Sequence, residues 1–185
     1  MAHKTIKVLV LLGLLPLAGC LAFGVPYSSD PNILIGNAYE MMRQGRPLPA
    51  KQFIDDALEK FRAEGNELGM AEAYHTYGNF YKNRNLGFKR YEESEENFRK
   101  ALVLYEKHNN YAGMVKSHFG IGNTYRSRDT AKECDEYRQS LLNYQKGIKS
   151  NPDLDKQIGL LNPHFRNTGD MITAFMTDIG CKQNS

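Results

Sequence analysis

Three asparagines at near-regular spacing are the residues of this chain best suited to polar recognition. Asn37, Asn79 and Asn123 each follow a glycine and stand two positions before a tyrosine, in the tetrapeptides GNAY, GNFY and GNTY. The intervals are 42 residues (79 − 37) and 44 residues (123 − 79). A side-chain amide has one acceptor and two donors, so it can satisfy a peptide C=O and a peptide N–H at once. The recurrence predicts three equivalent polar positions in a repeated structure.

The reactive side chains do not form a catalytic pattern. The sequence contains no G-x-S-x-G motif, no H-E-x-x-H motif and no glycine-rich phosphate loop. His75 and His118 have no evident Ser or Cys to activate, and no His or Cys pair has the spacing of zinc ligands. We therefore expect no enzyme activity, no metal, no cofactor and no small-molecule substrate.

Length and charge narrow the class of partner. The 185 residues favour one domain together with a targeting segment, and the hydrophobic share of 41% is that of an ordinary globular protein. Lys4 and Lys7 belong to a segment that we expect to be removed. Without them, 22 basic residues (24 − 2) face 21 acidic residues, a net charge of +1. A nucleic-acid partner is not expected at this charge.

The N-terminus has the pattern of a secretory signal. Lys4 and Lys7 precede an apolar run over 8–17, and small residues follow it. Ten residues of helix are about 15 Å long, roughly half the hydrocarbon thickness of a bilayer. The alternative is an uncleaved membrane anchor. The motif LAGC, which ends at Cys20, resembles the lipobox of bacterial lipoproteins.

The lipobox resemblance implies a processed and acylated N-terminus. In that family the chain is cut before the cysteine, which receives a diacylglyceryl group and an amide-linked acyl chain such as palmitate. Residues 1–19 would then be the signal peptide, and residues 20–31 a lipidated Cys20 with its tether. Because Leu21 rather than Asp follows the cysteine, the resemblance implies the periplasmic face of the outer membrane in a Gram-negative bacterium. Several acyl chains make release from the bilayer negligible.

The elements that must position the three asparagines are helices. Residues 57–84 match residues 101–128 without a gap, which indicates an internal repeat. Apolar residues recur at i, i+3, i+4 and i+7, the spacing of an amphipathic helix, in six stretches. The first helix of each unit carries such a stripe at 32–39, 74–81 and 118–125, and the second helix at 54–61, 98–105 and 137–144. The pattern predicts an all-α fold of about three helix–turn–helix repeats over 32–151.

Gly36, Gly78 and Gly122 fall within the first-helix stripes. Glycine inside a helix costs about 1 kcal/mol relative to alanine, so we expect that a close approach of the paired helix compensates at each position. At 100° per residue, the asparagines lie about 140° from the start of the stripe. They should therefore point away from the seam between the paired helices.

This repeat resembles the tetratricopeptide repeat over roughly residues 32–150. On the first helices the match is carried by Ile35, Gly36 and Tyr39, by Tyr77, Gly78 and Tyr81, and by Ile121, Gly122 and Tyr125. On the second helices it is carried by Ala50, Ile54 and Ala57, by Ser94, Phe98 and Ala101, and by Tyr137 and Ser140. The departures are a period longer than 34 residues, Asn32 in place of an opening aromatic, and Glu133 where a small residue is expected.

The resemblance implies a concave groove for a protein or peptide partner. The residues it places there are Asn37, Asn79 and Asn123, with His75, Lys82, Lys116 and Arg126 around them. The asparagines would bind the backbone of an extended peptide. Alternatively, they only bond neighbouring helices or face solvent. Two functions follow: a scaffold in pilus or envelope assembly, or a periplasmic immunity protein that blocks one folded toxin or enzyme.

Segment 152–185 is predicted to cap the repeats. Asn162 as N-cap, Pro163 at the first helical position and Gly180 at the end delimit a final amphipathic helix. A stack of repeats needs such a cover over its last apolar face. The helix could instead turn back into the groove.

Two further features concern the cysteines and one long connection. Cys134 and Cys181 remain once Cys20 is assigned to lipid, and they could form a disulfide closing about 48 residues or stay as free thiols.

Residues 83–90 make the second unit longer than the third, which predicts an enlarged connection. Its exposed Leu86 and Phe88 could contact a partner or lipid headgroups, or form a passive surface loop.

Overall fold

The protein is all-helical in the part that the structure describes, residues 26–160 and 162–182 of a computed structural model. No β-strand occurs in that part. The helices are α1 (Pro31–Arg43), α2 (Pro47–Ala63), α3 (Glu67–Tyr81), the short 3₁₀ helix η1 (Arg84–Leu86), α4 (Tyr91–Lys107), α5 (Tyr111–Tyr125), α6 (Thr130–Ser150), α7 (Leu154–Ile158) and α8 (Thr168–Asp178). Each of the six predicted stripes lies within one of these helices. The signal segment 1–19 and Cys20 lie outside the described residues.

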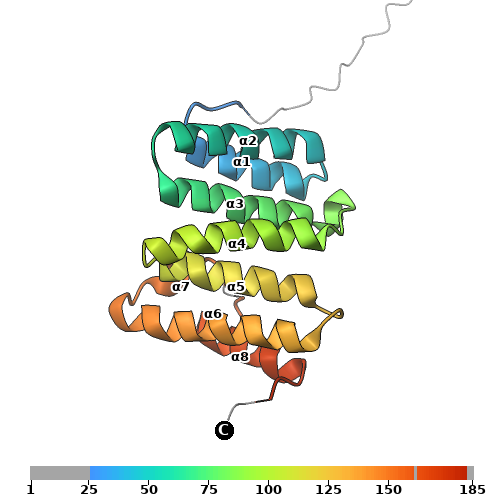
Figure 1. Ribbon diagram of the computed structural model, residues 1–185, viewed down its shortest axis with the longest axis vertical. Helices are drawn as coiled ribbons and strands as arrows, with labels where there is room; N and C mark the ends of the chain where they lie inside the picture. Colours follow the sequence, from blue (N-terminus) through green and yellow to red (C-terminus); the bar gives the residue numbers. More distant parts are fainter. Residues whose placement is uncertain (1–25, 161, 183–185) are drawn as a thin grey trace, which may run out of the picture.

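The first six helices form three antiparallel pairs that stack along one direction (Figure 1). The pairs are α1 with α2, α3 with α4, and α5 with α6, and consecutive pairs meet through α2 with α3 and α4 with α5. Helices α1, α3 and α5 also contact one another in sequence. These three helices therefore bring together side chains that are 42 to 44 residues apart in the sequence.

The connections alternate between two edges of this stack. Connections within a pair, 44–46, 82–90 and 126–129, lie at the right-hand edge of Figure 1, and connections between pairs, 64–66 and 108–110, lie at the left. At the left-hand edge, Asn66 Oδ1 accepts a hydrogen bond of 2.8 Å from the Gly69 amide, and Asn110 Oδ1 does the same for Gly113. These N-caps satisfy a backbone donor that the first turn of a helix leaves free.

Two of the three predicted glycine contacts are confirmed. A Cβ at Gly78 would lie 2.6 Å from the Phe98 ring, and one at Gly122 would lie 2.6 Å from the Tyr137 ring. The prediction for Gly36 was wrong, because this residue is exposed and a Cβ there would meet no atom of the described residues within 4 Å. In the repeat alignment, α2 has Ile54 where the other two units have an aromatic ring.

The C-terminal segment contributes two helices instead of one. The predicted start at Asn162 and Pro163 was wrong, because α8 begins at Thr168 with Asn167 as its N-cap. Helix α8 packs against α6, and the additional short helix α7 packs against α5 (Figure 1). A Cβ at Gly169 would lie 2.6 Å from the Tyr144 ring, which repeats the glycine–aromatic contact of Gly69 with Phe61 and of Gly113 with Tyr105. Helix α8 thus occupies the position that the first helix of a fourth repeat would have.

A disulfide fixes the end of the described chain. Cys134 in the first turns of α6 is bonded to Cys181, three residues after α8 ends. The sequence separation of 47 makes this a long closed loop. Among the described helices, none combines the length and the apolar character that crossing a bilayer would require.

Candidate functional site

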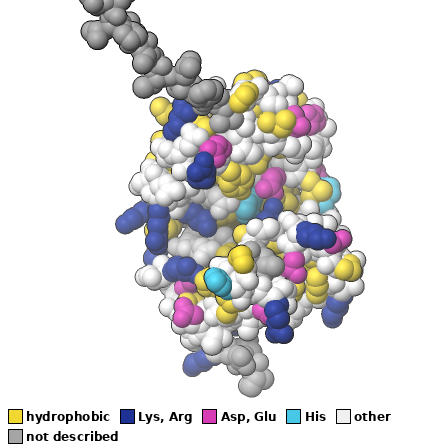
Figure 2. Space-filling view, turned by 180° about the vertical axis from the view of Figure 1, so that it is seen from behind, with side chains coloured by type: hydrophobic (Ala, Val, Ile, Leu, Met, Phe, Trp, Pro, Cys, Tyr) yellow, Lys and Arg dark blue, Asp and Glu magenta, His cyan; other side chains and the backbone are white. Residues whose placement is uncertain are grey.

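A cavity of about 530 Å³ lies between the three pairs, on the side of the stack formed by α1, α3 and α5. Figure 2 views the stack from behind relative to Figure 1 and shows this face hollowed beside a group of Lys and Arg side chains. The lining residues are Tyr39, Met42, Asn79, Lys82, Asn83, Arg84, Asn85, Tyr91, Asn123 and Arg126. Four of the predicted groove residues, Asn79, Lys82, Asn123 and Arg126, are therefore brought together.

The cavity wall is positively charged. Lys82, Arg84 and Arg126 line it, and none of its described lining residues is an acid. Burial, and secondarily the charge of Arg126, lower the pKa of Lys82 to about 8. Lys82 is half-buried and has no carboxylate partner among the described residues. Such a cation favours the entry of an anionic group, because that group would offset the cost of desolvation.

Arg126 is held in place from three sides. Its Nη2 donates a hydrogen bond of 3.0 Å to the Tyr137 hydroxyl, and its Nε lies 3.4 Å from Glu133 Oε1. The ring of Phe175 in α8 stacks at 5.4 Å from the guanidinium carbon. Glu133 is buried with 2% of its surface exposed. The acid that departs from the tetratricopeptide pattern thus contacts this arginine.

The amide of Asn123 is fixed at both ends and keeps one donor. Its Nδ2 donates to the Phe119 carbonyl oxygen at 2.9 Å, and its Oδ1 accepts from the Tyr137 hydroxyl at 2.9 Å. An amide nitrogen has two hydrogens. The second hydrogen has no acceptor among the described residues and can meet a C=O group in the cavity.

The amide of Asn79 keeps a free acceptor, whereas that of Asn123 keeps a free donor. Its Nδ2 donates to the Tyr39 hydroxyl at 3.2 Å and lies 3.3 Å from His75 Nδ1. Both hydrogens are thereby directed at protein groups, whereas Oδ1 has no donor within the described part of the chain. Asn79 can therefore accept from a ligand N–H, and Asn123 can donate to a ligand C=O.

Three predicted groove residues are not brought to the cavity. Asn37 donates from Nδ2 to the Pro26 carbonyl oxygen at 2.9 Å and so secures the segment before α1. His75 is buried against the ring of Phe98, with a centroid distance of 5.1 Å. Lys116 pairs with Glu72 at 2.9 Å. The alternative of bonding to neighbouring helices describes Asn79, which bonds to Tyr39 of α1, and Asn123, which bonds to Tyr137 of α6. It does not describe Asn37, whose partner Pro26 precedes α1.

Lys116 belongs to a partly buried polar network instead, and the charge of Glu72 in this network acts on His75. Glu72 Oε2 accepts hydrogen bonds from the Tyr105 hydroxyl at 2.7 Å and from Lys116 Nζ at 2.9 Å. Burial, opposed in part by the Glu72 charge, lowers the pKa of His75 to about 4. The imidazole is therefore neutral at pH 7, which allows it to lie beside Lys116 and Lys82. The network joins α3, α4 and α5 behind the cavity.

Six lining residues were missed by the groove prediction. They are Tyr39, Met42, Asn83, Arg84, Asn85 and Tyr91. Three of the six come from the enlarged connection, where Asn83 Oδ1 accepts from the Asn85 amide at 2.9 Å and starts the turn of η1. The extra length of 83–90 was the available signal. Leu86 and Phe88, which we expected to be exposed, are half-buried against the hydrophobic core formed by α1, α2 and α3.

Comparison with protein-family models, with curated proteins and with solved structures gives no match. The function is therefore inferred from the cavity and from the sequence motifs.

Proposed function

We propose that this chain is a non-enzymatic, lipid-anchored scaffold of the bacterial cell envelope that binds an acidic segment of a partner polypeptide in the central cavity. The observation that carries this proposal is the composition of the cavity wall, in which Lys82, Arg84 and Arg126 lie beside two asparagine amides and no acid is found among the described lining residues. Carboxylates of a partner would pair with the cations. The partner's backbone would bond to Asn79 and Asn123.

The dimensions of the cavity support a short segment as the ligand. A volume of about 530 Å³ is within the range of roughly 300–1,000 Å³ that small ligand sites occupy. The free acceptor of Asn79 and the free donor of Asn123 match the alternating N–H and C=O groups of an extended chain. Recognition of this kind depends little on the partner's side chains, so the cations supply the selectivity for acidic sequences.

Two sequence features complete the proposal. The lipobox ending at Cys20 would hold the protein on the periplasmic face of the outer membrane through its acyl chains. The three helix pairs and the glycine–aromatic contacts support a tetratricopeptide-like stack, whose open side is the one that carries the cavity. A scaffold of this type would hold a partner close to the bilayer surface.

Peptide binding to matched asparagine variants tests the proposal. The probes are fluorescent hexapeptides rich in Asp and Glu, together with isosteric Asn and Gln peptides, and affinity is measured by fluorescence anisotropy. Asn123→Ala should weaken binding of the acidic peptides by about tenfold, the value of one hydrogen bond to a charged or buried group. Asn97→Ala is the control, because Asn97 Nδ2 also donates to the carbonyl four residues earlier, at 2.8 Å, but lies outside the cavity.

Lys82→Met separates charge from amide recognition. It should abolish the preference for acidic over isosteric peptides and leave the thermal transition nearly unchanged, since Lys82 has no carboxylate partner among the described residues. Equal affinity of the parent chain for acidic and neutral peptides would contradict the proposal. Tight binding of one folded partner without any peptide binding would favour the immunity function.

A further inference from the structure

The connections within the helix pairs are rich in Lys and Arg, and all of them lie at one edge of the stack. We define the basic edge as connections 44–46, 82–90 and 126–129. Its charged residues are the cations Arg46, Lys82, Arg84, Lys89, Arg90, Arg126 and Arg128 and the single acid Asp129. The connections at the opposite edge, 64–66, 108–110 and 151–153, contain Glu64 and Asp153 and no Lys or Arg. Among the connections, positive charge is thus concentrated at one edge, although the net charge of the whole chain is only +3.

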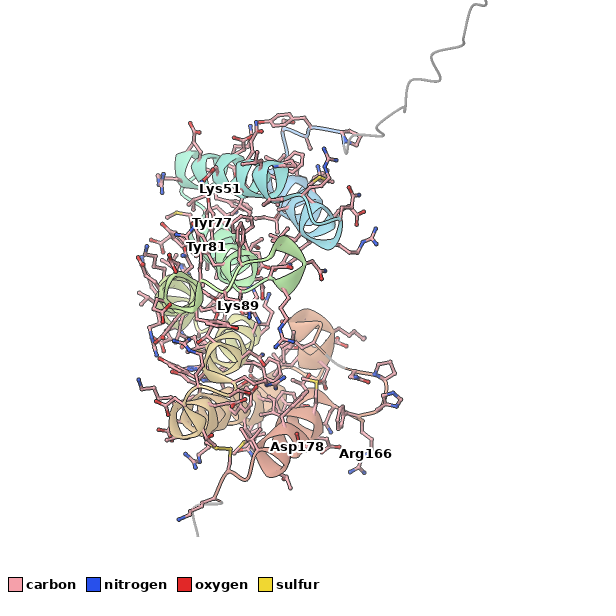
Figure 3. All side chains as sticks on the ribbon, turned by 90° about the vertical axis from the view of Figure 1, so that its right-hand side faces the viewer. Lys51, Tyr77, Tyr81, Lys89, Arg166 and Asp178 are labelled. Carbon is pink, nitrogen blue, oxygen red and sulfur yellow. A yellow bond between two sulfur atoms is a disulfide. The ribbon has the colours of Figure 1, made fainter. Side chains whose placement is uncertain are left out.

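The three connections form one continuous surface. A Cβ at Gly45 would lie 3.4 Å from the Asn85 carbonyl oxygen, which places the first connection against the second. Arg128 of the third connection pairs with Glu92 at 2.7 Å, just after the second connection ends. In Figure 3 this edge faces the reader, and Lys51, Tyr77, Tyr81 and Lys89 follow one another down it.

Part of this positive charge is not neutralised within the molecule. Arg90, Arg126 and Arg128 pair with Glu93, Glu133 and Glu92 respectively. Arg46, Lys82, Arg84 and Lys89 have no carboxylate partner in the described part of the chain. Lys82 and Arg84 line the cavity, whereas Arg46 and Lys89 do not. The latter two are exposed and available to an anionic surface outside the cavity.

An exposed apolar residue accompanies these cations. Leu48, in the first turn of α2, has 82% of its surface exposed, the largest value among the large hydrophobic residues described. It lies between Arg46 and Lys51 in the sequence. Tyr81 at the same edge is half-buried, with the Arg90 guanidinium 4.7 Å from its ring centroid. Cations, tyrosine and one projecting leucine are the side chains that suit a phospholipid headgroup layer.

We propose that the basic edge docks on the anionic headgroups of a phospholipid bilayer. The position of the chain's entry permits this orientation. Asn37 bonds to Pro26 and lies at the middle of α1, six residues from either end, so Pro26 is about 9 Å along the helix from the basic edge and equally far from the opposite edge. Cys20 precedes Pro26 by six residues (26 − 20), a reach of about 20 Å. This last step alone rests on the proposed acylation of Cys20.

Vesicle partitioning with charge-matched variants tests whether the basic edge binds anionic lipid. The full chain carrying Cys20→Ser is mixed with vesicles of phosphatidylcholine, or of equal parts phosphatidylcholine and phosphatidylglycerol, and the bound fraction is measured by sedimentation. The N-terminal segment is the same in all variants, so differences between them report on the edge. Arg46→Glu/Lys89→Glu should lower partitioning to anionic vesicles by at least about 25-fold, at about fivefold for each cation removed. Leu48→Asn should lower it by a further factor of roughly ten.

Arg62→Glu/Lys149→Glu is the matched control. Both residues are exposed, both lie in the last turns of second helices near the opposite edge, and the change in net charge is the same. This variant should partition within about threefold of the parent chain, since charge far from the surface is screened. Equal partitioning of the two double variants, or a parent chain that does not prefer anionic vesicles, would overturn the proposal and indicate an acidic polypeptide as the occupant. Peptide affinity at the cavity is unaffected in either case, so the two proposals fail independently.

Discussion

Asn79 of α3 donates a hydrogen bond of 3.2 Å from Nδ2 to the hydroxyl oxygen of Tyr39 in α1. The two residues come from equivalent tetrapeptides one repeat apart, GNAY and GNFY. The tyrosine of one unit thus orients the asparagine of the next and directs its free Oδ1 toward the cavity. Burial, assisted by the Glu72 charge, raises the pKa of Tyr39 to about 12, so the hydroxyl stays protonated.

Tyr39→Phe should weaken binding of acidic peptides by releasing the Asn79 amide. We expect a loss of about threefold to tenfold in affinity, and a loss of about 1 kcal/mol in the free energy of unfolding, the usual value of one hydrogen bond. Anisotropy and urea unfolding measure the two effects. In the double variant with Asn79→Ala, the two affinity losses should be less than additive. Full additivity would contradict the orienting role.

Gly78→Ala and Gly36→Ala should change stability in opposite directions. The Cβ at Gly78 would clash with the Phe98 ring, at a cost of about 1–3 kcal/mol. A Cβ at Gly36 would meet no atom within 4 Å in the part of the chain that the structure describes, so alanine should stabilise the helix by about 0.5–1 kcal/mol. Urea unfolding of the two variants beside the parent chain is the measurement. Destabilisation by both substitutions would show that the seam also closes at Gly36.

The affinity for acidic peptides should fall as the pH rises through the pKa of Lys82. Burial lowers that pKa to about 8, and binding of an anion must raise it, because only the protonated amine pairs with a carboxylate. Above pH 8 the affinity should therefore decrease by up to tenfold per pH unit. Lys82→Arg is the control, since arginine does not titrate in this range. The same decrease in both proteins would exclude Lys82 as the titrating group.

Acid should destabilise the fold through His75 before the carboxylates titrate. The folded pKa of about 4 lies below the ordinary value of 6.5, so the unfolded chain binds the proton first. The free energy of unfolding should then fall by about 2 kcal/mol between pH 6.5 and pH 5. His75→Gln should start from a lower stability and lose much less over this interval. Parallel pH profiles of the two proteins would contradict the buried, neutral imidazole.

Removal of the Cys134–Cys181 disulfide should lower stability substantially. In the chain-entropy model, closing a loop with a sequence separation of 47 contributes about 4 kcal/mol. Cys134→Ser/Cys181→Ser should therefore unfold at clearly lower urea concentration than the oxidised parent chain. Under a thiol reductant the parent should approach the variant, whereas the variant itself should not change. A reductant effect of equal size on both proteins would argue against this bond.

The helices and their seams could be predicted from the sequence alone. Apolar residues at i, i+3, i+4 and i+7 depend only on local geometry, so six stripes located six helices. The same local reasoning identified Gly78 and Gly122 as sites of close approach. It was wrong at Gly36, because the partner side chain decides the contact, and the paired helix has no aromatic ring at the equivalent position. It was also wrong about the start of α8, since Asn162 and Asn167 are both good N-caps.

The composition of the cavity was decided by the tertiary structure. Lys82 and Arg126 are 44 residues apart (126 − 82), and only the stacking of α3 on α5 places both at one wall. Lys116 has the same residue type as the lining residue Lys82, but it pairs with Glu72 in a network that no local pattern predicts. Sequence periodicity determines which face a residue occupies. Whether that face is open depends on charges and rings from other helices, and these are brought there only by folding.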